Sequence, residues 1–155
     1  MKKTGIFSVV VFLVALFLVA ESYTQSGTRQ RGSEGWGPGN QYGRMYDPKT
    51  VETIRGEVVR VDKITPLRAM SFGIHLVVKT EKEKISVHLG PVWFIENQDI
   101  KIEAKDNIEV KGSRITFQGN PTIIAAEVKK GEFILKLRDE SGFPVWSGWR
   151  RRGWR

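Results

Sequence analysis

Two histidines, His75 and His88, are the residues of this chain best suited to hold a metal ion or a proton. The chain has no cysteine, which excludes disulfides, thiolate metal sites, cysteine nucleophiles and covalently attached c-type haem. Each histidine lies in a stretch of alternating apolar and polar residues. If Val78 faces Ile85 across a hairpin, then His75 faces His88, and both imidazoles point outward from the core.

This pairing favours a weak zinc or copper site, or a pH-sensitive contact. Directly opposite strand residues have Cβ atoms about 4.5–5.5 Å apart, close enough for two rings to share one cation. Two ligands make only half of a tetrahedral zinc site, although Glu57 or Glu127 could approach from neighbouring strands. The alternative is two exposed strand histidines without a ligand. Apart from such weakly bound zinc or copper, we expect no cofactor.

No catalytic motif is visible in the sequence. No Gly-x-Ser-x-Gly elbow accompanies the histidines, and the chain has neither a phosphate loop nor a dinucleotide fingerprint. Most carboxylates stand beside lysines, as is typical of solvated, ion-paired faces. The sequence therefore predicts a protein that is not an enzyme.

The C-terminal tail combines tryptophan with arginine. This composition suits a bilayer interface, where indoles lie at headgroup depth and guanidinium groups meet phosphates, and it equally suits a protein hot spot. The alternative is that Val145 and Trp146 pack on the folded part while the arginines are solvated. The candidate contact residues are Trp146, Trp149, Arg150, Arg151, Arg152 and Trp154.

The elements that must position these residues are strands. Apolar alternation changes parity between Val58 and Val59, which predicts a β-bulge that returns the apolar residues on both sides to the core, and Gly112 predicts a second bulge. Gly119-Asn120 predicts a hairpin turn, and Pro91 begins a short helix. The predicted strands are residues 51–63, 73–80, 84–89, 107–117, 122–129 and 132–137.

Three strands, a short helix and two further strands are the order of an OB-type barrel. We therefore predict an all-β fold: a small five-stranded OB-type barrel with a short helix between strands three and four, plus a C-terminal sixth strand and a tail. Trp93 or Phe94, or both, are expected to plug the barrel.

Residues 1–22 have the three parts of a secretory signal peptide. After a positive start, residues 6–20 form an apolar run of 15 residues broken by one serine, and Ala20 and Ser22 have the spacing of a cleavage site. As a helix the run spans only about 22 Å, less than a hydrocarbon core of about 30 Å. We expect cleavage and a periplasmic or secreted protein; an uncleaved inner-membrane anchor is the alternative.

The rest of the chain divides into three segments. Residues 23–46 form a leader rich in glycine and arginine, expected to be flexible, although its aromatic residues suit packing on the barrel or on a partner. Residues 47–138 form the barrel and residues 139–155 the tail. The net charge of +8 lies mainly outside the barrel, since residues 51–137 carry 14 Lys and Arg against 12 Asp and Glu. This distribution argues against nucleic-acid binding.

Three stretches resemble a bacterial family of exported OB-like proteins, the domain named after the magnetosome proteins MamS and MamX. They are residues 46–54, 87–91 and 123–128, and the resemblance covers about residues 45–149. It implies an exported barrel and no particular chemistry, because the family includes members from bacteria that make no magnetite. The c-type haem motifs of some magnetosome relatives are absent, which excludes electron transfer by that route.

Three functions follow in order of preference. The first is a non-enzymatic periplasmic OB-fold binding module that acts through an unknown protein or envelope component, with membrane-surface contact as one form. The second is metal or small-ligand binding on the face of strands two and three. The third is nucleic-acid binding, which is disfavoured because those two strands carry no aromatic residue and the charge of their hairpin, residues 73–89, is nearly balanced.

Overall fold

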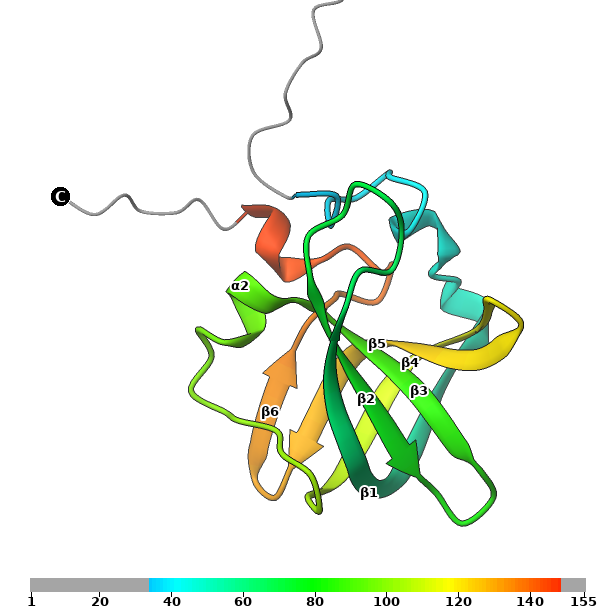
Figure 1. Cartoon of the computed structure of the whole chain (residues 1–155), viewed down its shortest axis with the longest axis vertical. Helices are drawn as coiled ribbons and strands as arrows, with labels where there is room; N and C mark the ends of the chain where they lie inside the picture. Colours follow the sequence, from blue (N-terminus) through cyan, green and yellow to red (C-terminus); the bar gives the residue numbers. More distant parts are fainter. Residues whose placement is uncertain (1–33, 149–155) are drawn as a thin grey trace, which may run out of the picture.

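The computed structural model describes residues 34–148 and is built almost entirely from β-strands (Figure 1). The short helix α2 is the one α-helix among the described residues, and three 3-10 turns complete the elements. The strands are β1 Val51–Ile64, β2 Gly73–Lys79, β3 Lys84–Pro91, β4 Asn107–Phe117, β5 Asn120–Lys130 and β6 Phe133–Lys136. The helix is α2 Val92–Ile95, and the 3-10 turns are η1 Gly43–Met45, η2 Pro48–Thr50 and η3 Val145–Gly148.

Five of the strands close into a barrel. Their order is β3-β2-β1-β4-β5, and parallel pairing of β3 with β5 closes the ring. β6 pairs with residues 127–130 of β5, outside the ring. β3 pairs with β5 only at residues 122–124. The predicted five-stranded barrel, its sixth strand and the helix between strands three and four are confirmed.

The bulge predicted in β1 is present, with one detail different. The register shifts between Val58 and Arg60, and Val58 points into the core. Val59 is the extra residue and stays 42% exposed, and Val61 after it is 36% exposed, so neither returns to the core as predicted. On its other side, Val58 bonds with the loop before β4: its N–H donates to Asp106 O (2.8 Å) and its O accepts from Lys105 N (2.7 Å).

The β4–β5 hairpin also differs from its prediction by one residue. Gln118 and Gly119, both with positive φ (48° and 79°), form the two-residue turn, and Asn120 is already paired with Phe117. Two positive φ values are what the twist of a tight hairpin requires. The bulge predicted at Gly112 is confirmed, since the register shifts between Lys111 and Gly112.

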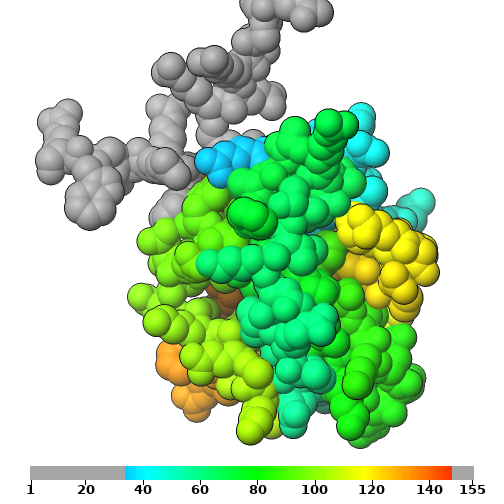
Figure 2. All heavy atoms as spheres, in the orientation of Figure 1, coloured from blue at the N-terminus to red at the C-terminus, as the bar shows by residue number. Residues whose placement is uncertain are grey.

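The short helix α2 buries Phe94 in the core, whereas Trp93 is only half-buried. Phe94 is therefore the main plug residue of the predicted pair. The loop after α2 runs beside β1, where Lys63 Nζ lies 2.6 Å from Glu96 Oε1, and the two segments share one face in Figure 2. Within residues 34–148, no helix is long and apolar enough to cross a membrane.

The described part of the leader, residues 34–46, is packed on the barrel. Trp36, Tyr42 and Tyr46 are all buried, which corrects the expectation of a flexible segment for these residues. The composition is rich in glycine, but three large rings bury enough apolar surface to offset the entropy of ordering the backbone.

Candidate functional site

The two histidines face each other as predicted. The register pairs Val78 with Ile85, Leu76 with Val87 and His75 with His88. The imidazole centroids are 5.4 Å apart with the ring planes at 78°, so the rings meet edge to face. The sequence therefore located the pair correctly from the alternation of two strands.

The predicted exposure of this pair is wrong. His88 is only 2% exposed, because Tyr42 stacks on its ring at 5.9 Å and Phe117 meets it edge-on at 5.0 Å. The part of the outer face of β2 and β3 around His88 is thus covered by other parts of the chain. Both histidines do point away from the barrel core, but they do not point into solvent.

Burial keeps His88 and Tyr42, whose side chains touch in this site, uncharged. It lowers the pKa of His88 to about 3, and the charges of His75 and Arg138 act in the same direction. It also raises the pKa of Tyr42 to about 12. The Tyr42 Oη and His88 Nδ1 atoms are 3.0 Å apart, so a neutral phenol can donate to the Nδ1 atom of a neutral imidazole.

His75 is nearer the surface and is oriented by a carboxylate. Its Nδ1 atom lies 3.6 Å from Asp62 Oδ2, and Arg60 Nε donates to the same oxygen at 2.6 Å. Burial lowers the pKa of His75, while Asp62 acts in the opposite direction. Arg60, Asp62, His75, His88 and Tyr42 therefore form a line of polar groups that runs from the surface into the covered face.

A metal ion in this site would have few ligands. Within residues 34–148, no group of three or more histidine or carboxylate side chains is placed to hold a metal. Glu57 and Glu127, the third ligands considered from the sequence, line two clefts elsewhere on the barrel. A weak two-histidine site for zinc or copper stays a prediction.

The cover over β2 and β3, which we call the aromatic lid, consists of Trp36, Tyr42 and Trp146. Two strand glycines receive its indoles. A Cβ atom on Gly73 would lie 2.3 Å from the Trp36 ring, and one on Gly90 would lie 2.7 Å from the Trp146 ring. Only glycine permits this approach. Gly73 at the start of one predicted strand and Gly90 directly after another were the sequence signal for the lid, and sequence reasoning did not use it.

Hydrogen bonds fix both indoles of the lid. Trp36 Nε1 donates to Ser71 O at 3.0 Å, and Trp146 Nε1 donates to Trp36 O at 2.9 Å. The two rings meet edge to face with centroids 6.3 Å apart. Buried indole N–H groups need such partners, so each indole is held in one orientation.

One of the candidate tail contacts is therefore reassigned. Trp146 is 2% exposed and packs on Phe94 at 5.4 Å, so it belongs to the lid and is not a surface contact residue. Its neighbour Val145 is exposed. The packing of Trp146 is one of the two alternatives that the sequence left open. The other candidates, Trp149, Arg150, Arg151, Arg152 and Trp154, lie outside the described residues.

Arg138 joins the lid to the barrel. Its side chain is 8% exposed, and its Nη1 atom donates to Leu89 O at 3.0 Å and to Ala125 O. The guanidinium carbon lies 4.9 Å from the centroid of the Trp146 ring, a cation–π contact. The sequence analysis did not single out this residue.

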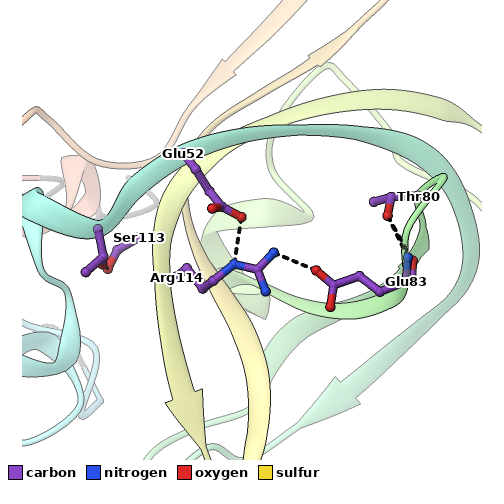
Figure 3. A network of polar contacts seen from close by, with 6 residues as sticks. Glu52, Thr80, Glu83, Ser113 and Arg114 are labelled. Carbon is purple, nitrogen blue, oxygen red and sulfur yellow. Dashed lines mark hydrogen bonds and ion pairs between the residues drawn. The ribbon is translucent and has the colours of Figure 1, made fainter.

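A second polar network lies away from the lid (Figure 3). Arg114 on β4 lies between two carboxylates, with Nε 2.7 Å from Glu52 Oε1 and Nη2 2.6 Å from Glu83 Oε1. Hydrogen bonds to Glu83 and Glu52 raise the pKa of Arg114. The network ties the β2–β3 turn to β1 and β4, and each carboxylate already has its partner, so its role is structural.

The fold and these sites define a class: a small closed β-barrel in which the terminal segments of the described chain cover part of the outer face of β2 and β3. Comparison with protein families gives a match over residues 50–135 to the MamS/MamX magnetosome protein family. The match covers more than half of the chain, so the protein belongs to this family, as the sequence resemblance indicated. A comparison with curated proteins found no match.

Proposed function

We propose that this protein is an exported, non-enzymatic OB-type binding module that works through a protein or envelope partner. The observation that carries the proposal is the junction of Trp36 with Trp146, which brings both ends of the described chain to one end of the barrel (Figure 1). Membership in a family described as magnetosome proteins, and not as enzymes, supports a binding role.

The junction matters because of what the sequence carries on either side of it. Upstream lies the apolar run of residues 6–20, and downstream lies the tail with Trp149, Trp154 and three consecutive arginines. The last described turn, η3, is anchored by buried Trp146, so the tail begins from a fixed point of the barrel. A fixed starting point reduces the ordering entropy that a contact made by the tail would cost.

The experiment compares the full chain with a variant that ends at Gly148. Both are tested for co-purification with envelope proteins and for sedimentation with vesicles containing anionic lipids. We expect loss of binding in the truncated variant with an unchanged urea unfolding midpoint. A variant with Trp149→Ala and Trp154→Ala keeps every arginine and separates aromatic contact from charge. If the truncated protein binds as well as the full chain, the tail is not the contact.

A second candidate function rests on the contact between the two imidazoles, which is the zinc or copper site predicted from the sequence. Calorimetric titration of each metal into the wild type, His75→Ala and His88→Ala tests it. Equal binding by all three proteins would exclude the histidines. Nucleic-acid binding gains no support, because β2 and β3 carry no aromatic residue for base stacking and part of their outer face lies under the aromatic lid.

A further inference from the structure

A cleft of about 530 Å³ opens on the outer side of the barrel. It is lined by three cations, Lys111, Lys136 and Arg138, by three carboxylates, Glu127, Asp139 and Glu140, and by an apolar wall that includes Tyr46 and Val145. Sequence reasoning did not identify this cleft, because its walls come from the leader, from four strands and from the segment after β6.

The sheet register places the lysines in one row. Lys111 on β4 is opposite Glu127 on β5, and Glu127 is opposite Lys136 on β6. Arg138 follows Lys136 by two residues. Both lysines are exposed on either side of Glu127, whereas Arg138 is buried in the wall of the cleft.

These three cations have no carboxylate partner among the described residues. The nearby acids are engaged elsewhere or solvated. Asp139 accepts hydrogen bonds from Ser141 N (3.0 Å), Ser141 Oγ (2.7 Å) and Phe143 N (2.9 Å). Glu127 lies 3.8 Å from Lys129, and Glu140 is exposed.

Arg138 carries the strongest argument. A guanidinium presents five N–H donors, and here only Nη1 donates to acceptors of the described chain. Burial lowers the pKa of Arg138, and the groups that oppose this effect are Tyr42 and Tyr46, with no carboxylate among them. A buried cation that no anion compensates is costly, so an anion bound beside it would be strongly favoured.

We propose that this cleft binds a small molecule that joins an oxyanion, carboxylate or phosphate, to an apolar body. Arg138 recognises the oxyanion, the two lysines attract it at the rim, and Val145 and the Tyr46 ring contact the apolar part. Planar guanidinium groups suit carboxylate and phosphate alike, since both present paired oxygens. The site does not include residues 149–155 and does not depend on the partner role proposed above.

The test follows backbone amide shifts of the full chain during titration with phenyl phosphate, benzoate and inorganic phosphate at constant ionic strength. We expect saturable shifts near Lys136, Arg138 and Val145 for the two aromatic probes, with inorganic phosphate binding more weakly. The double variant Lys111→Gln/Lys136→Gln leaves the core untouched and should weaken binding about fivefold. Arg138→Lys keeps the charge but loses the planar donor pair and should weaken binding about tenfold.

The matched control is Lys82→Gln/Lys84→Gln, which removes the same charge from the β2–β3 hairpin and should change affinity less than about twofold. The proposal fails if neither aromatic probe saturates below about 10 mM. It also fails if the cleft variant binds as the control does. Tighter binding of inorganic phosphate than of phenyl phosphate would contradict the apolar wall.

Discussion

The two outer faces of this barrel differ in the charge of their buried nitrogen groups. On the β2–β3 face, His88 lies under the aromatic lid and is neutral, because burial lowers its pKa to about 3. Beside the β4–β5–β6 face, Arg138 is also buried, at 8% exposed, but remains charged and lines a cleft. An imidazole responds to burial by losing its proton, whereas a guanidinium cannot. The neutral His88 on the covered face therefore needs no partner from outside the chain, whereas the charged Arg138 beside the open face favours the binding of an anion.

The largest effect on stability is expected from removing a ring of the aromatic lid. Trp146→Ala deletes a ring that contacts Trp36, Phe94 and the Arg138 guanidinium, and should lower the free energy of unfolding by about 3–5 kcal/mol. Urea unfolding measures it. Val145→Ala, at an exposed neighbour, serves as the control and should change stability by less than about 0.5 kcal/mol. Equal losses in both variants would mean that Trp146 is not an anchor.

A smaller loss is expected when the lid is pushed away from its strand. Gly73→Ala adds a Cβ atom 2.3 Å from the Trp36 ring and should cost about 1–3 kcal/mol. Gly119→Asn is the comparison, because Gly119 has positive φ but open space around it, and asparagine tolerates that conformation. Thermal unfolding of both variants checks the expectation; an unaltered midpoint for Gly73→Ala would place the Trp36 ring elsewhere.

The neutral imidazole makes stability depend on pH. The unfolded chain binds a proton at His88 near pH 6.5, but the folded protein does not bind it until about pH 3. The stabilisation from this group is therefore complete above pH 6.5 and is lost as the pH falls toward 3, by up to about 1.4 kcal/mol per pH unit. His88→Gln should flatten the dependence measured by urea unfolding between pH 7 and pH 4. An equally steep dependence in this variant would assign it to other groups.

The smallest effect concerns the network at Arg114, whose three members are partly exposed. Arg114→Gln should cost about 1 kcal/mol or less, because solvent screens the two ion pairs. The difference from wild type should shrink further in about 1 M salt. A loss as large as that of Trp146→Ala would show that the network contributes as much to stability as the lid does.

Local signals were sufficient to predict the barrel. Alternation placed every strand within a few residues, and the parity change at Val58 located the bulge. The slip at the β4–β5 hairpin arose because Gly119 can occupy either central position of a tight turn, and the pairing of Phe117 with Asn120 decides between them. The histidine pair was also predictable, since its register follows from two adjacent strands.

The lid and the cleft were not predictable in this way, because their contacts join distant parts of the chain. Tyr42 reaches His88 across 46 residues, and Trp146 reaches Trp36 across 110. Low aliphatic content in residues 34–46 favoured a flexible segment, and nothing local shows that its rings fit over two strand glycines. Arg138 was overlooked for the same reason, as its burial depends on the lid.

The sequence by itself determined the order of the strands, the two bulges and the facing of His75 with His88, because side-chain alternation is a property of neighbouring residues. Only the tertiary structure decided that these histidines are covered, that Trp146 is an anchor, and that Arg138 stands charged beside a cleft. Exposure and charge depend on which distant segments exclude water from a group, and that information exists only after the chain has closed on itself.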